Sequence, residues 1–415
     1  MKRFLQSENS RLTDILFFSG LAVYLLHFQC KLLAWTGALR IIGDVGAMVF
    51  LDASVFAVAI YLVCRVLQQT RQLPYLLFLA AAVILLLFLW PRLDYAVRCW
   101  VINIFLILAA RGRAFNRTLT VYFAVYAAGL AAASLGLLFG YTRNNVKWQL
   151  YGSGSSLGYI SGNNMSRMLL WMAIMAWLLF FRKSLKKTFL CFLPVILVAG
   201  FYARCRTVVI MAVLILLAAV ITHYRKPWRK WSAAKRKRIC IIITLLPFIM
   251  LGLSLVLSFV LIPLIPYVRE TFLWNFFSRF VQNNIALREY GVSAGGIWVD
   301  FLGSVSRNFF GEEIHLLILD NAYVPWLIRN GIIRTVLLLG TLSVSQYRAF
   351  RHRDRPLLIA FSAILLYGLM EPAAVQVHYN FAFLYLLAAP FSKAAAIRRG
   401  KTGQNGSDKF VTGSE

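Results

Sequence analysis

Apolar segments of about bilayer length recur along the whole chain, with polar links between them. A helix needs roughly 20 apolar residues, and rarely fewer than about 17, to cross the hydrocarbon core of a membrane. Twelve segments approach or reach this length, at 13–33, 44–64, 74–90, 94–110, 119–140, 165–181, 188–203, 207–222, 239–264, 322–343, 357–371 and 376–391. The pattern predicts an all-α, polytopic integral membrane protein whose residues 1–415 form a single transmembrane domain.

Some details of this prediction stay open. The link around Pro91 is so short that 74–90 and 94–110 could instead form one re-entrant hairpin. No small-residue cleavage site follows the first apolar segment, so we expect it to be a retained span and not a signal peptide. Composition agrees with the membrane class: 60% of the residues are hydrophobic, 14% are charged, and the mean hydropathy is +0.71.

Basic residues are distributed unequally between the two ends of the predicted spans. Lys and Arg are retained in cytoplasmic loops. Of the 44 basic residues, 29 lie in the links and tails of one face, at the N-terminus, 65–73, 111–117, 182–187, 224–238, 347–355 and 393–415. Both termini and the tail 393–415 are therefore predicted to be cytoplasmic. The formal charge of +29 is explained by topology and by contact with anionic lipid, and not by nucleic-acid binding.

The opposite, extracytoplasmic face holds the two longest links, 141–164 and 265–321. Ten of the 15 acidic residues lie on this face or in the outer halves of spans, including Asp300, Asp320 and Glu371. Mixed charge on a face that the insertion machinery leaves neutral is typical of a site for a charged, polar ligand. We expect the functional site there, with 265–321 as a large extracytoplasmic loop.

Signatures of several enzyme classes are missing. The six cysteines are widely spaced and indicate neither a disulfide framework nor a zinc site. No P-loop, dinucleotide fingerprint or His-Glu-x-x-His occurs. Any reaction is therefore expected to use a substrate that is already activated.

Arginines on the extracytoplasmic side are candidate ligands for an anionic group. Arg204 and Arg206 precede the apolar run 207–222, with Thr207 as a possible helix cap, and helix N-termini with arginine bind phosphate well. The alternative for both is an interfacial position without function. Arg279, in WNFFSRF, is either a further ligand or a solvated loop charge.

Asp320 comes just before the span that contains Pro325. A carboxylate at this place can accept a proton from a hydroxyl group, or it can simply cap the helix. Arg329 and Arg334 fall inside the same span, where a charge is usually paired, and Glu371 is one possible partner. Arg334 is about ten residues, roughly 15 Å, into the span and is predicted to be structural.

Four of these motifs together resemble a known family. SSLGYISGNN, RCRTVVI, WNFFSRF followed by LREYG, and LILDNAYVPWLIRNGII occur in this order over about residues 120–345. The set is similar to the Wzy-type polysaccharide polymerases of O-antigen, capsule and exopolysaccharide and, more distantly, to the O-antigen ligases. The chain departs from the family pattern at Ser278-Arg279, which lacks an intervening glycine, at Cys205-Arg206-Thr207, and at Gly162.

The resemblance implies a bacterial inner-membrane glycosyltransferase that joins repeat units carried on undecaprenyl pyrophosphate, without metal or cofactor. Arg206 and Arg279 would hold the pyrophosphate leaving group, and Asp320 would activate the acceptor hydroxyl. Asn163 and Asn164 would contact sugar or diphosphate. Further substrate contacts are expected from Arg204, Arg288, His315, Asn321, Tyr323 and Glu371.

The expected partners are the lipid-linked oligosaccharide, membrane lipids, a flippase and a chain-length regulator. Three other functions stay open. A ligase of the same superfamily differs only in its acceptor. A flippase for lipid-linked oligosaccharides also needs polar groups among its spans. A small-solute transporter usually shows paired repeats, and none is visible.

Overall fold

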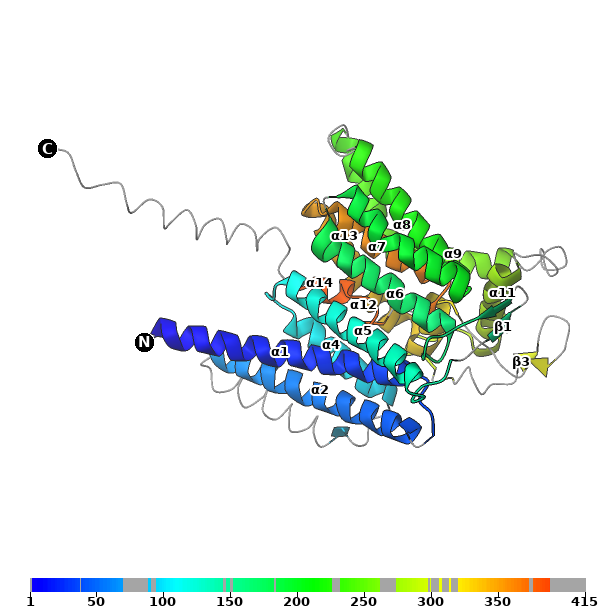
Figure 1. Cartoon of the computed structure of the whole chain (residues 1–415). Helices are drawn as coiled ribbons and strands as arrows, with labels where there is room; N and C mark the ends of the chain where they lie inside the picture. The colour runs from blue at the N-terminus through cyan, green and yellow to red at the C-terminus, as the bar shows by residue number, and fades with distance from the viewer. Residues whose placement is uncertain are drawn as a thin grey trace. The chain divides into compact units, whose positions relative to one another are not determined.

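The structure is a computed structural model, and helices dominate the part of the chain that it describes (Figure 1). The chain divides into two compact units, Met1–Leu179 with Leu384–Glu415, and Phe180–Phe383. We refer to them as unit 1 and unit 2. The described residues are 2–37, 39–69, 89–90, 95–144, 147–149, 152–182, 184–225, 232–261, 274–297, 299, 306–307, 313–314, 320–372 and 376–388.

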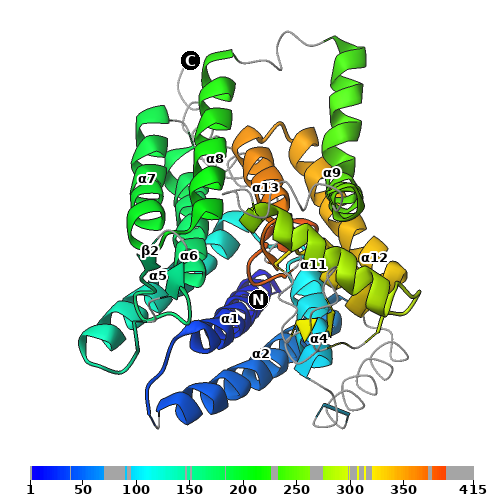
Figure 2. The same ribbon diagram turned by 90° about the vertical axis from the view of Figure 1, so that its right-hand side faces the viewer.

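Unit 1 contains five of the labelled helices. They are α1 (Lys2–Leu32), α2 (Leu39–Gln69), α4 (Tyr95–Ala109), α5 (Phe115–Leu138) and α6 (Gly162–Ala176), and a short hairpin of β1 (Lys147–Gln149) and β2 (Gly152–Gly154) precedes α6. Helices α1 and α2 lie side by side along most of their length (Figures 1 and 2). Helix α5 packs on α1, and α4 packs on α2.

Unit 2 is built from α7 (Leu185–Leu197), α8 (Arg206–Arg225), α9 (Ala233–Val260), α11 (Trp274–Tyr290), α12 (Tyr323–Arg351) and α13 (Arg355–Tyr367). Two-residue strands β3 (Ser306–Arg307) and β4 (Glu313–Ile314) pair between α11 and α12. Helix α9 packs on α12, and α8 packs on both α7 and α13 (Figure 2). The short α14 (Ala382–Tyr385) follows at the boundary of the two units.

Helix starts follow local capping rules. The hydroxyl groups of Ser161, Ser184 and Ser232 accept hydrogen bonds from backbone amides in the first turns of α6, α7 and α9, which satisfies donors that a helix start leaves unpaired. Pro194 lies inside α7 and is followed by the π-helical turn Val198–Tyr202. Proline removes a backbone donor, and a wider turn can take up the resulting irregularity.

Eight described helices are long and apolar enough to cross a membrane, so the prediction of an all-α, multi-pass membrane protein is confirmed. They are Leu12–Leu32, Leu39–Arg65, Phe115–Leu138, Gly162–Phe181, Leu185–Tyr202, Arg206–Tyr224, Ala233–Val260 and Tyr323–Arg351. Arg98–Ala109 and Arg355–Tyr367 are apolar but shorter. Most of the predicted span 74–90 lies outside the described residues, as does the tail 393–415.

The prediction of a span at 376–391 is wrong for its described residues. Residues 376–388 form turns and the four-residue α14, and not a continuous helix. Tyr379, Phe381 and Phe383 are buried, and the hydroxyl group of Ser345 donates to the carbonyl oxygen of Ala382 (2.8 Å). The apolar run therefore reflects burial inside the protein, which hydropathy alone cannot distinguish from burial in lipid.

The predicted loop 265–321 contains a helix, α11, of 17 residues. One face of α11 joins α12 in an apolar cluster of Val281, Ile285, Ala286, Val324 and Ile328. Apolar residues at positions i, i+4 and i+5 lie on one face of a helix. This packing fixes α11 against the start of α12.

Helix α12 is broken at Gly331, whose backbone has φ 71° and ψ 179°. The segment after α11 closes the break, because the amides of Ile332 and Ile333 donate to the carbonyl oxygens of Ser293 (3.1 Å) and Ala294 (3.2 Å). The part of α12 after Gly331 has about 20 residues, and a rise of 1.5 Å per residue makes it about 30 Å long. This part alone matches the thickness of a bilayer.

Replacing Gly331 by alanine is expected to destabilise the protein. A side chain in this backbone region costs about 1–3 kcal/mol, and the new Cβ would lie 2.3 Å from the Gly296 nitrogen and 2.4 Å from the Ala294 oxygen. Thermal unfolding of the purified protein in detergent should show a Tm lowered by several degrees. Gly340, on the same helix, has open space at its Cβ position, so Gly340→Ala is the matched control and should keep or raise the Tm. Equal Tm values for the two variants would contradict the break at Gly331.

Candidate functional site

One guanidinium group and two carboxylates meet at one end of unit 2. Nη2 of Arg279 lies 3.6 Å from Oδ2 of Asp320 and 3.6 Å from Oε1 of Glu371. Nη1 of Arg279 donates to the carbonyl oxygen of Met370. The side chains of Arg279 and Glu371 are 14% and 6% exposed, whereas Asp320 is 36% exposed. Arg279 thus bridges a buried carboxylate and one that solvent reaches.

Three helices bring this cluster together. Arg279 lies on α11, Asp320 directly precedes α12, and Glu371 follows α13. Two sequence expectations change here. Arg279 is not a solvated loop charge, and Glu371 pairs with Arg279, a partner that was not expected from sequence.

Asn321 fixes the position of Asp320. Its Oδ1 accepts hydrogen bonds from the amides of Tyr323 (2.8 Å) and Val324 (3.1 Å), and its Nδ2 donates to the carbonyl oxygen of Leu369 (3.0 Å). The Asn321 side chain is fully buried. It therefore caps α12 and also ties this helix to the residues just before Glu371.

The capping role considered for Asp320 thus belongs to its neighbour. Tyr323 also has a structural contact, because its hydroxyl group donates to the carbonyl oxygen of Leu365 (2.6 Å) and its side chain is 1% exposed. The polar atoms of Asn321 and Tyr323 serve the fold in this structure. Asp320 is the member of the Asp-Asn-Ala-Tyr motif with a solvent-accessible polar group.

The first turn of α8 lies at the same end of unit 2. Helices α8 and α13 run antiparallel, because Nη1 of Arg355 at the start of α13 donates to the carbonyl oxygen of Thr222 near the end of α8 (3.4 Å). A groove between them is lined by Met211 of α8 and Leu366 of α13, among others. Arg206, at the start of α8, therefore lies toward the end of α13 that leads to Glu371.

Arg204 and Arg206 are both exposed. Helix α8 begins at Arg206 itself, so Thr207 lies within its first turn, and the expectation that Thr207 caps this helix is wrong. Arg204 has a left-handed backbone with φ 56°, and the amide of the following Cys205 donates to the carbonyl oxygen of Ala199 (2.7 Å). The turn that carries these arginines is thus held in an unusual conformation.

The remaining predicted residues of this region are not part of the cluster. Arg288 is exposed in the last turn of α11, nine residues or roughly 14 Å along the helix axis from Arg279. His315 lies outside the described residues.

SSLGYISGNN lies in unit 1 and is tightly packed. Tyr159 is fully buried, and the Gly158 carbonyl oxygen accepts a hydrogen bond from the amide of Ala34 (2.8 Å). Gly158 has φ 83°, and a Cβ there would lie 2.4 Å from the Ala133 oxygen. The length of this connection is therefore explained by packing against the end of α1 and against α5.

Asn163 and Asn164 lie in the first turn of α6 and are partly exposed. Oδ1 of Asn164 accepts a hydrogen bond from Nη2 of Arg167, whose side chain is only 6% exposed. Sequence reading missed Arg167. Its signal was an arginine one turn inside an apolar helix, where a charge is expensive and usually functional or paired.

Asn283 and Asn284 on α11 were also missed. Both side chains are fully buried, and no hydrogen-bond partner of their amide nitrogen and oxygen atoms is found in the described part of the chain. An unsatisfied buried amide costs about 1–3 kcal/mol, so such groups usually need an explanation. Asn283 is one helical turn from Arg279, which places a second polar group on the same side of α11.

The break in α12 changes the interpretation of Arg329 and Arg334. Nε of Arg329 donates to the carbonyl oxygen of Val299 (3.0 Å), and Arg334 is exposed in the first turn after Gly331. Arg334 therefore lies at the start of the bilayer-length segment and not about 15 Å inside it. The structural role of Arg334 was predicted from a position deep in the membrane, and the structure does not give it that position.

Among the described residues, no group of three or more His, Cys, Asp or Glu side chains is arranged to hold a metal ion. Comparison with known proteins gives no match: no family model, no curated protein and no solved structure matches the chain.

Proposed function

We propose that the protein is a bacterial polysaccharide polymerase that joins repeat units carried on undecaprenyl pyrophosphate at the outer leaflet of the cytoplasmic membrane. The observation that carries the proposal is the partly exposed Asp320, which is held beside Arg279 and Glu371 while Asn321 caps the helix. The exposed Arg204 and Arg206 at the same end of unit 2 add to it. A carboxylate near fixed cations suits the transfer of a sugar from a pyrophosphate to a hydroxyl group.

In the proposed reaction Asp320 accepts the proton of an acceptor hydroxyl group as its oxygen attacks the anomeric carbon of the donor sugar. The new bond joins this oxygen to the anomeric carbon. The bond between the anomeric carbon and the phosphate oxygen breaks, and undecaprenyl pyrophosphate leaves with the electron pair. The negative charge of the leaving group grows in the transition state.

Arg206 is the proposed ligand of the leaving group, and Arg204 assists it. A guanidinium group presents planar, paired donors that match phosphate oxygens. Fixed donors that meet developing charge stabilise the transition state without reorganisation. Their exposure at the start of α8 leaves room for a large lipid-linked substrate.

Arg279 receives a different role from the one expected from sequence. Its guanidinium contacts two carboxylates and a carbonyl oxygen, so its donors already have partners within the protein. Arg279 is therefore proposed as a positioning residue for Asp320 and Glu371.

A ligase would use the same chemistry with a different acceptor, and a flippase would move the substrate without forming a bond. Incubation of the purified protein with synthetic lipid-linked repeat units separates these functions, because only a polymerase lengthens the glycan on its lipid carrier.

Asp320→Asn is expected to lower the polymerisation rate by about a hundredfold or more, because an amide cannot accept the proton. Its Tm should stay close to that of the parent, since the cap of α12 is Asn321. Asn321→Ala should show the opposite pattern, with a loss of about 1 kcal/mol of stability and a smaller loss of rate in the folded fraction. Rates are measured at matched protein levels, with Tm measured alongside. A parental rate for Asp320→Asn would exclude Asp320 as the base.

Arg206→Lys is expected to lower the rate by roughly a hundredfold, because lysine keeps the charge but loses the paired contact to phosphate. Arg40, which is exposed at the start of α2, provides the matched control, and Arg40→Lys should retain the parental rate. The measurement is the rate of polymer growth at saturating lipid-linked substrate. If both lysine variants work at the parental rate, the leaving-group ligand lies elsewhere.

The proposed topology places the start of α9 in the cytoplasm and the segment after α11 outside. In a cysteine-free background, Val292→Cys should react with an impermeant thiol reagent on intact cells from which the cell wall has been removed. Ala234→Cys should react only after lysis. Both positions are exposed in the structure, so accessibility is matched, and the reverse labelling pattern would invert the topology.

A further inference from the structure

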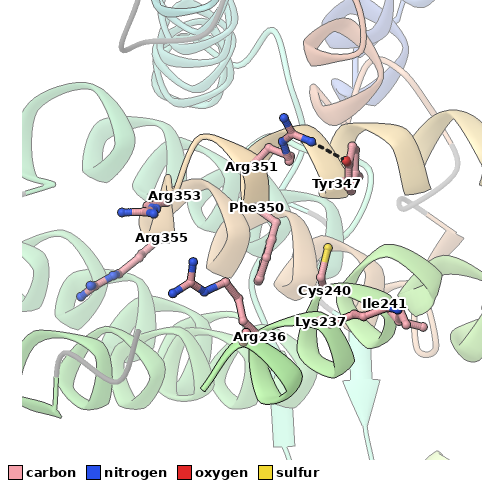
Figure 3. A pocket seen from close by; sticks show the side chains of 10 residues that line it. Arg236, Lys237, Cys240, Ile241, Tyr347, Phe350, Arg351, Arg353 and Arg355 are labelled. Carbon is pink, nitrogen blue, oxygen red and sulfur yellow. Dashed lines mark hydrogen bonds between the residues drawn. The ribbon is translucent and has the colours of Figure 1, made fainter. Parts of the chain in front are cut away.

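A cavity of about 1030 Å³ lies in unit 2 at the end of α12 farthest from Asp320 (Figure 3). One wall is the start of α9, and the other is the end of α12 with the turn into α13. We call it the basic cavity. Ten residues of unit 2 line it.

Five of these residues are cations, and they come from both walls. Arg236 and Lys237 belong to α9, whereas Arg351, Arg353 and Arg355 belong to the opposite wall (Figure 3). Among the described lining residues there is no carboxylate. Cations that line one cavity repel one another, and an anion in that space would relieve the repulsion.

Asp354, the carboxylate nearest to these arginines in the sequence, has other partners. Oδ2 of Asp354 lies 3.1 Å from Nη1 of Arg182, and its Oδ1 accepts a hydrogen bond from the amide of Leu357 (3.2 Å). Its side chain is 11% exposed. Asp354 thus caps α13 and pairs with Arg182, although arginines of the basic cavity precede and follow it.

Arg353 has a left-handed backbone with φ 53°. This conformation is easy for glycine and unfavourable for a long side chain. An arginine at this position, with its side chain in the cavity wall, suggests that the guanidinium group has a use that outweighs the conformational cost.

The cavity also has an apolar side. Cys240, Ile241 and Phe350 contribute to its lining. Below it, α9 exposes Ile242, Leu245 and Ile249, which continue along the helix into the apolar part of the predicted span. A ligand with a phosphate head and a hydrocarbon tail would match both the cations of the cavity and the apolar surface of α9. A nucleotide or a free phosphate would use only the cations.

We propose that the basic cavity binds the head group of an anionic phospholipid in the adjoining leaflet, with an acyl chain lying along α9. Basic sites between helices at this level of a membrane suit such head groups. The cavity lies at the upper end of the usual range of about 300–1,000 Å³ for ligand sites, and it has cations on two walls. A lipid with two phosphates should therefore bind most tightly. The inference does not depend on the proposed polymerase activity.

The test is a lipid titration of the purified protein in detergent. Cardiolipin, phosphatidylglycerol and phosphatidylcholine are added separately, and an apparent Kd is obtained from the rise in Tm. Cardiolipin should stabilise most and phosphatidylcholine least. The double variant Arg236→Gln with Lys237→Gln should bind cardiolipin about thirtyfold more weakly, at roughly 1 kcal/mol for each basic residue and 1.4 kcal/mol for each tenfold change.

A matched control separates the cavity from general positive charge. Lys235 and Arg238 are exposed on the same two turns of α9 and do not line the cavity. The double variant Lys235→Gln with Arg238→Gln removes the same charge and should bind cardiolipin within a few-fold of the parent. Equal losses in the two double variants would mean a diffuse charged surface and would overturn the proposal.

Two further measurements test the site and the identity of its ligand. Arg353→Gly removes one lining cation and suits the left-handed backbone, so the lipid-free protein should be at least as stable as the parent while its response to cardiolipin falls. An unchanged response would count against the site. Pyrophosphate and glycerol phosphate are titrated as soluble anions, and stabilisation by either as strong as by cardiolipin would overturn the assignment to a lipid.

Discussion

The backbone hydrogen bonds that close the break in α12 are the contact on which the site of unit 2 depends. A break in a helix leaves backbone amides without their partners in the helix, and such groups need other acceptors. The carbonyl oxygens of Ser293 and Ala294 accept hydrogen bonds from two of these amides. The amide of Ile297 donates in turn to the carbonyl oxygen of Ile328 (3.0 Å). Because this segment follows α11 directly, the same bonds fix α11 relative to α12. Arg279 and Asp320 are thereby held within 3.6 Å.

Charge is organised differently at the two ends of unit 2. At one end, the buried Glu371 and the accessible Asp320 share one guanidinium group. At the other end, five cations line a cavity without a carboxylate among its described lining residues. The first arrangement holds the carboxylate that we propose as the proton acceptor. The second arrangement suits permanent attraction of an anion, and we infer that the anion is a lipid head group.

The positions of most helices were predictable from sequence. Eight described helices coincide with predicted apolar segments, because the period and length of apolar runs reflect the thickness of the bilayer. The segment 376–391 was predicted wrongly, since burial of Tyr379 and Phe381 inside the protein gives the same hydropathy as burial in lipid. The helix α11 was not expected either, because its apolar residues, such as Val281 and Ile285, are interrupted by asparagines and an arginine.

Sequence by itself determined the membrane class, the helical spans and the residue types available for chemistry, because these follow from local composition. Only the tertiary structure decided which of these residues share a site. It joined Arg279 with Asp320 and Glu371, gave the helix cap to Asn321, and moved Arg334 from the middle of a span to the start of one. The physical reason is that partner choice depends on contacts between α11, α12 and α13, which lie far apart in the chain, and on a single left-handed glycine whose effect no local hydropathy pattern reports.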